Sequence, residues 1–336
     1  MNEKELLTAL GALAPLYQDQ DIGEIMVDAP DRVYVDRRVD GEWQLQDVAS
    51  PFKSAEDIRA VMDAVLALEG IQLGPERTSA DVRFPDGSRM LAVIPPTAPN
   101  GPCLVIRHML GTLSSVITWD NLIQWRSVTQ EVYEFLQGAI RANVVMLIAG
   151  GANSGKTTLA NRIAELIPRD KRVIVVEAVQ EMQVRHPRCL CLEAGGPANV
   201  SFADLLDTAA RMRPDWLVIG EIWGSEAMRA LQIMGRGHIG LMNTHADGTE
   251  DALGRLEAMC LMANLGLGLG EIRRTITSGL RLILYHEKLP EGRRVTQITE
   301  LRGLENDRYV LQPLFRYNHE KKLLEATGAK PSWESR

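Results

Sequence analysis

The chain has 336 residues, of which 45% are hydrophobic and 24% charged, which is typical of a soluble globular protein with about two domains. Its 37 basic and 44 acidic residues give a formal charge of −7, which excludes a general basic surface for a nucleic-acid duplex. Four scattered cysteines exclude a disulfide framework, and the sequence contains no apolar run of the ~20 residues that span a bilayer, so we expect a cytoplasmic chain.

The first part of the chain is predicted to be a small α+β domain. Residues 3–16 follow an amphipathic helical pattern, and residues 54–68 form a second predicted helix. Short strand-like runs accompany these helices and are separated by turns such as the one at 85–87. Helices and hairpins without a βαβ rhythm indicate an N-terminal α+β domain over residues 1–112, followed by a linker at 113–120.

A glycine-rich loop between an apolar run and a helical pattern is the central motif. Gly150 is followed by four residues and then by Gly155, Lys156 and Thr157, which is the spacing of a P-loop. In such a loop, backbone N–H groups at a helix N-terminus hold a polyphosphate, and Cβ atoms at the glycines would obstruct its approach. The predicted nucleotide-binding residues are Gly150, Gly151, Ala152, Asn153, Ser154, Gly155, Lys156, Thr157 and Thr158.

The P-loop also predicts the cofactors. Lys156 supplies a positive charge to the β- and γ-phosphates, and the Thr157 hydroxyl is a ligand for Mg²⁺. We therefore expect ATP and Mg²⁺ to bind here.

After the P-loop, predicted strands alternate with predicted helices. Residues 172–177 and 215–221 are apolar strands that each end in a carboxylate, and residues 240–243 form a third strand. This alternation indicates a parallel sheet with its site at the carboxyl edge. The predicted fold class is α/β: a RecA-like P-loop core with a mostly parallel sheet over residues 121–324, plus the smaller N-terminal α+β domain. Residues 325–336 lack apolar periodicity and are expected to be a disordered tail.

Glu221 separates hydrolysis from the other reactions of P-loop proteins. It ends a core strand, where a carboxylate can reach Mg²⁺ through a water or act as the general base for an attacking water. Glu177 ends the neighbouring predicted strand and is expected at the same edge. His245 ends the next strand, where it can hydrogen-bond a γ-phosphate oxygen. A surface carboxylate is the alternative role for Glu221, but its apolar lead-in favours hydrolysis.

Two arginines of the first domain are further catalytic candidates. Arg89 and Arg107 lie in predicted strands, where an isolated arginine is by default a surface ion-pair residue. They are alternatively cations that complete a cage around the γ-phosphate when the domains close. The residues alone leave both alternatives open.

With these motifs in view, the chain resembles the secretion traffic ATPases of type II and type IV systems, in the branch that serves Tad/Flp pili and conjugative transfer. The resemblance covers nearly the whole chain. It is carried by residues 25–35, 86–89, 92–96, 105–107, the P-loop, 211–215, 220–222, 237–246, 251–257, 293–300 and 313–317.

The resemblance implies an assembly as well as roles. It implies a homo-hexamer at the cytoplasmic face of the inner membrane, partnered by an inner-membrane platform protein, with ATP between a PAS-like N-terminal domain and the core. It assigns Glu221 to the Walker B element and Arg89 and Arg107 to arginines that point at the phosphates. It also assigns Glu177 and Glu181 to an acidic box, and His238 and His245 to a histidine box.

Four features depart from the family pattern. The usual Thr-Gly inside the P-loop is Ala152-Asn153, the second box acid is Ala178, Trp223 replaces an arginine, and Thr244 directly precedes His245.

The leading hypothesis is a motor that hydrolyses ATP to drive transport of pilin or protein substrates. The alternative is a conjugative-transfer ATPase or a motor that acts on DNA, against which the acidic charge counts. A small-molecule kinase lacks any sequence sign of an acceptor pocket.

Overall fold

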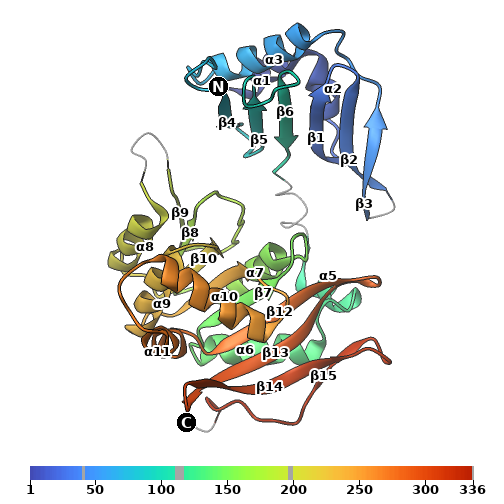
Figure 1. Ribbon diagram of the computed structural model, residues 1–336. Helices are drawn as coiled ribbons and strands as arrows, with labels where there is room; N and C mark the ends of the chain where they lie inside the picture. Colours follow the sequence, from blue (N-terminus) through green and yellow to red (C-terminus); the bar gives the residue numbers. More distant parts are fainter. Residues whose placement is uncertain (40–41, 110–116, 196–199, 335–336) are drawn as a thin grey trace. The chain divides into compact units, whose positions relative to one another are not determined.

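The computed structural model describes residues 1–39, 42–109, 117–195 and 200–334. The chain divides into two compact units, Met1–Thr112 and Leu113–Arg336, each with its own sheet and hydrophobic core (Figure 1). Residues 113–116 of the predicted linker at 113–120 lie outside the described residues, and its last two residues already belong to helix α5.

Unit 1 (Met1–Thr112) is an antiparallel six-stranded sheet with helices on one face, in the order β3-β2-β1-β6-β5-β4. Alternate strand residues such as Ile25, Val35 and Ile106 are buried against α1 and α3, whereas their neighbours lie on the opposite face. The strand β3 was not predicted. The elements are α1 Glu3–Leu10, η1 Gly11–Leu13, α2 Ala14–Tyr17, β1 Ile22–Ala29, β2 Arg32–Val39, β3 Glu42–Val48, α3 Ala55–Ala67, β4 Ser79–Arg83, β5 Arg89–Val93 and β6 Cys103–Arg107.

Unit 2 (Leu113–Arg336) contains a nine-stranded sheet in the order β15-β14-β13-β12-β7-β11-β10-β8-β9. The strands from β12 to β9 in this order pair in parallel, whereas β12 to β15 form antiparallel hairpins. The predicted α/β class with a mostly parallel sheet is therefore confirmed. The strands are β7 Met146–Gly150, β8 Val173–Glu177, β9 Cys189–Glu193, β10 Trp216–Ile222, β11 Gly240–His245, β12 Leu282–Leu289, β13 Gly292–Glu305, β14 Arg308–Asn318 and β15 Leu323–Ala326.

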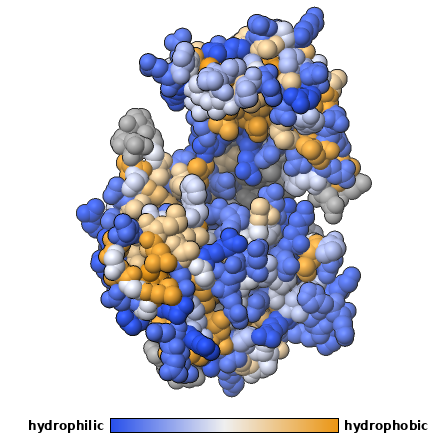
Figure 2. Space-filling view, viewed as in Figure 1, coloured by the Kyte–Doolittle hydropathy of each residue, from blue (hydrophilic) through white to orange (hydrophobic). Residues whose placement is uncertain are grey.

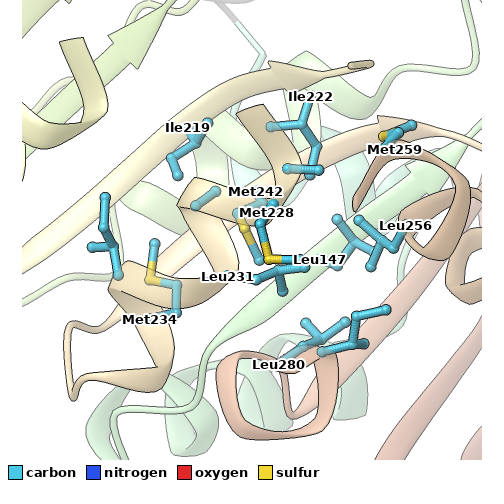
Figure 3. Close-up of a cluster of buried hydrophobic side chains, with 14 of the residues drawn as sticks. Leu147, Ile219, Ile222, Met228, Leu231, Met234, Met242, Leu256, Met259 and Leu280 are labelled. Carbon is cyan, nitrogen blue, oxygen red and sulfur yellow. The ribbon is translucent and has the colours of Figure 1, made fainter. Parts of the chain in front are cut away.

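Helices cover both faces of this sheet, which is why β7 and β8 are buried throughout. One core lies between the sheet and α8 to α11, where side chains such as Leu147, Leu231 and Met242 meet (Figure 3). A second core lies on the side of α6 and α7 and contains the fully buried Trp216. The helices are α5 Trp119–Gln124, α6 Gln130–Arg141, α7 Lys156–Ala164, α8 Phe202–Arg211, α9 Glu226–Gly235, α10 Thr249–Met262 and α11 Leu269–Gly279.

The C-terminal segment differs from the expected disordered tail. Strand β15 continues to Ala326, and Trp333 packs on Phe135 of α6. The backbone N–H of Ser332 donates to the fully buried carboxylate of Glu300, at 3.2 Å. These anchors belong to residues far away in the sequence. The segment is therefore ordered although its own sequence shows no helical or strand periodicity.

The surface of unit 2 is uneven in polarity. In Figure 2 the side built from α9, α10 and α11 carries more apolar surface than the side built from β13 to β15, and the exposed apolar residues there include Leu261, Met262, Leu265 and Leu269. Among the described residues, none of the helices is both long and apolar enough to cross a membrane.

Candidate active site

The P-loop connects the carboxyl end of β7 to the first residue of α7. Gly155 has a φ of 102° and Asn153 a φ of 56°, so the chain passes twice through the left-handed region within three residues. Asparagine tolerates this conformation better than most residues, which explains how a non-glycine residue occupies position 153.

The structure explains why position 150 is a glycine differently from the prediction. A Cβ at Gly150 would lie 2.2 Å from the backbone oxygen of His286, so this glycine is required by packing against β12. A Cβ at Gly151 would meet open space. Only Gly155, with its positive φ and its close contact to the His286 ring, requires glycine through its backbone conformation.

The side chain of Lys156 lies over the loop. Its Nζ donates to the backbone oxygens of Gly150 and Gly151 at 3.0 and 2.8 Å, and to Nδ1 of His245 at 3.3 Å. Glu221 Oε1 lies 3.9 Å away. Burial lowers the pKa of Lys156, and the carboxylates of Glu221 and Glu181 oppose that effect.

Glu221 and His245 are in direct polar contact beside Lys156. Their Oε1 and Nε2 atoms are 3.0 Å apart, because β10 and β11 are adjacent and end at the same edge. An ammonium group can only donate, so Nδ1 of His245 accepts from Lys156 and Nε2–H donates to Glu221. Both side chains are close to half exposed, so a ligand can reach them.

Glu177 has a different environment from the other predicted residues. It is 3% exposed and packs against Gly220, and its Oε1 accepts backbone N–H bonds from Glu181 and Met182, each at 3.0 Å. Burial raises its pKa to about 7. The structure therefore places Glu177 under the segment that carries Glu181. Of these two carboxylates, it is Glu181 that raises the pKa of Lys156, against the lowering by burial.

The remaining P-loop side chains surround the start of α7. Ala152 and Asn153 are exposed at the loop tip, and Thr157 and Thr158 are half-buried. The Ser154 hydroxyl is buried without a hydrogen-bond partner among the described residues. An unsatisfied buried hydroxyl, an open Gly151 and a carboxylate facing an ammonium group fit a polyphosphate with its Mg²⁺.

Two residues on the hairpin β12–β13 reach the P-loop but were not predicted. The buried ring of His286 lies beside Gly155, its Nε2 is 3.3 Å from the Ser127 hydroxyl, and burial lowers its pKa to about 4. Arg293 donates from Nε to the backbone oxygen of Asn153 at 2.9 Å. Sequence spacing carries no signal for such contacts, although residues 293–300 were part of the family resemblance.

Arg89 and Arg107 lie directly opposite each other on β5 and β6. Each has an acidic partner within unit 1: Arg89 pairs with Asp81 at 2.6 Å, and Arg107 with Glu24 at 3.0 Å. Both belong to the unit that does not contain the P-loop, so their role at the phosphates remains a prediction.

Comparisons with known proteins agree with these features. Residues 8–297 match the family described as "Type II/IV secretion system protein". The chain is 31% identical over 279 residues to the type IV secretion system protein PtlH of Bordetella pertussis, covering 75% of this chain and 80% of PtlH. It is 27% identical over 311 residues to the conjugal transfer protein TrbB of Rhizobium radiobacter, covering 91% and 92% of the two chains.

A solved structure supports the fold. The ATPase DotB of Yersinia pseudotuberculosis superposes with a TM-score of 0.58 at 15% identity, covering 89% of this chain and 79% of that chain. The predicted family resemblance is thereby confirmed by sequence, and the fold by structure.

Proposed function

The chain belongs to the type II/IV secretion system protein family, and from this membership and its P-loop we propose that it is an ATPase that drives secretion or conjugative transfer. The observation that carries this proposal is the cluster of Lys156, His245 and Glu221. An ammonium group, an imidazole and a carboxylate converge at the mouth of a phosphate loop, and a phosphate-binding lysine and a group that orients water are two of the parts that phosphoryl transfer to water uses.

Lys156 and the loop would bind the nucleotide. The ammonium group already lies over the loop, and a phosphate oxygen is a stronger acceptor than the carbonyls of Gly150 and Gly151 that it now contacts. Thr157 and, through a water, Glu221 would hold Mg²⁺, which when bound neutralises charge on the phosphates.

Glu221 would orient and deprotonate the attacking water. Its carboxylate is fixed by Nε2–H of His245, which is in turn fixed by Lys156, so the base has a defined direction before the ligand arrives. Arrival of a γ-phosphate would compete for Lys156 and His245 and release Glu221 toward water. Catalysis would rest on positioning and charge neutralisation.

Glu177 and Glu181, at and just after the end of β8, would complete the site. Glu177 holds the backbone of Glu181, and Glu181 adds a second carboxylate within electrostatic range of Lys156. We therefore propose Glu177 as a positioning residue, and Glu181 as the member of the acidic box that faces the nucleotide.

The larger assembly is part of the same proposal. Six copies would form a ring at the inner membrane with a platform protein, and closure of the two units on ATP would bring Arg89 and Arg107 to the phosphates. These arginines would then have to exchange Asp81 and Glu24 for phosphate oxygens. Light scattering with and without ATP tests the ring, since a monomer under both conditions contradicts it.

The experiment that tests the function compares the wild type with Glu221→Gln. The amide keeps an acceptor for His245 but cannot take a proton, so we expect nearly unchanged ATP affinity and at least a hundredfold slower hydrolysis. Binding by a fluorescent ATP analogue and phosphate release from ATP measure the two separately. Equal hydrolysis by both proteins contradicts the role of Glu221.

A further inference from the structure

The P-loop is contacted from outside by the hairpin β12–β13, which carries two positive charges on one face. Arg293 and Lys288 are direct cross-strand partners in this hairpin, and we call them the hairpin cations. Like charges directly opposite each other in a sheet repel and destabilise it. A polyanion bound at this face would offset the repulsion.

Neither hairpin cation has an acidic partner among the described residues. Both side chains are exposed, and the one hydrogen bond of Arg293 runs from Nε to the oxygen of Asn153. The terminal Nη atoms of Arg293 therefore keep their donors free within the described part of the chain. The adjacent Arg294, in contrast, is used in backbone contacts.

The contacts of Arg293 fix its charge beside the phosphate loop. Its Nε lies 2.9 Å from the Asn153 oxygen, and its Cδ lies 3.3 Å from the position of a Cβ on Gly155. The guanidinium is rigid and planar, so a bond through Nε holds the whole charged group at the loop. His286, two residues before Lys288 on the same face of β12, packs against the same glycine.

We propose that the hairpin cations bind the polyphosphate of the nucleotide in the same subunit, with Arg293 as the main contact and Lys288 as an outer charge. This inference rests on the proposed ATP site, and it adds a source of positive charge besides Lys156. Arg293 has two tasks in it. Its Nε supports the left-handed Asn153, and its charge attracts phosphate oxygens.

The two tasks of Arg293 are separable by substitution. Arg293→Lys keeps the charge, Arg293→Gln keeps a donor for the Asn153 oxygen without the charge, and Arg293→Ala removes both. Lys288→Ala removes the outer charge. Arg308→Ala is the matched control, since Arg308 is an exposed cation that lies opposite Glu305 in the register of β13 and β14, at the other end of β13.

The assay is equilibrium binding of ATP, inorganic triphosphate and adenosine to the full chain with Mg²⁺, at two salt concentrations. We expect Arg293→Gln and Arg293→Ala to weaken ATP and triphosphate binding by about tenfold, and Lys288→Ala by about threefold, because each removes one charge near a polyanion. Arg293→Lys should remain within about threefold of wild type. Adenosine binding should not change, and Arg308→Ala should match wild type throughout. Circular dichroism shows whether each variant is folded.

Two outcomes overturn the inference. If Arg293→Gln and Lys288→Ala bind triphosphate as tightly as wild type, the charges do not contact phosphate. If only Arg293→Ala is weakened, the arginine supports the loop and does not bind the ligand. A Lys156→Ala variant separates failure of this inference from failure of the proposed function. If Lys156→Ala loses binding while the hairpin variants bind like wild type, only the role of the hairpin cations is rejected. If the wild-type chain binds neither ATP nor triphosphate, both the inference and the proposed function are rejected.

Discussion

Replacing Glu177 by glutamine should stabilise the protein at alkaline pH. The carboxyl group is 3% exposed, and burial raises its pKa from 4.5 to about 7. A carboxyl that binds its proton more tightly in the folded state stabilises the fold at low pH, and this stability is lost as pH rises from about 4.5 through 7. The pKa difference corresponds to about 3 kcal/mol. Glutamine keeps the acceptor for Glu181 and Met182 but never becomes charged.

Urea unfolding at pH 5 and pH 8.5 measures this effect, followed by tryptophan fluorescence, to which unit 2 contributes five of the six tryptophans. Glu177→Gln should equal wild type at pH 5 and exceed it by about 2–3 kcal/mol at pH 8.5. Cys191 titrates in the same range, so both proteins carry Cys191→Ser. The exposed Glu250→Gln is the control and should show no pH-dependent gain. A Glu177→Gln variant no more stable than wild type at pH 8.5 refutes the burial argument.

Two further predictions concern packing and thiol chemistry. A hydrogen bond from the Cys189 thiol lowers the pKa of Cys191 to about 7, whereas burial raises the pKa of Cys260 to about 12. Because the thiolate is the reactive form, iodoacetamide at pH 7.5 should alkylate Cys191 first. Cys189→Ala should slow this reaction about tenfold, and an unchanged rate measured by mass spectrometry argues against the thiol pair. Gly279→Ala would place a Cβ 2.5 Å from the Leu231 oxygen and should lower the free energy of unfolding by about 1–3 kcal/mol. Gly254→Ala is the control, because its Cβ would meet nothing within 4 Å, and it should be neutral or stabilising. Equal unfolding midpoints for the two variants contradict the close contact at Gly279.

The sequence predicted those parts of the site that depend on the local pattern of residues. The strand, glycine loop and helix around Lys156 are encoded within one continuous stretch, and Glu221 and His245 lie at the carboxyl ends of parallel strands that share one edge by topology. For that reason, the convergence of Lys156, Glu221 and His245 was accessible before the structure was known.

The sequence could not reveal contacts between distant strands. Arg293 and His286 reach the P-loop through the hairpin register and a parallel pairing of β12 with β7, and neither is visible in spacing. The anchor of Ser332 on Glu300 was missed for the same reason, since a short segment held by distant partners needs no period of its own. Glu177 was predicted at the same sheet edge as Glu221, but its burial against Gly220 is decided by packing between strands.

Phosphate release from ATP by the full chain, compared between wild type and Lys156→Ala, tests the central claim most directly. Lys156 contacts the P-loop backbone and His245 and lies 3.9 Å from Glu221, so its loss should abolish both nucleotide binding and turnover while leaving the fold intact. The account predicts sustained, Mg²⁺-dependent phosphate release by wild type and none above background by the variant. Equal rates in the two proteins, or no hydrolysis by the assembled wild type, would contradict it.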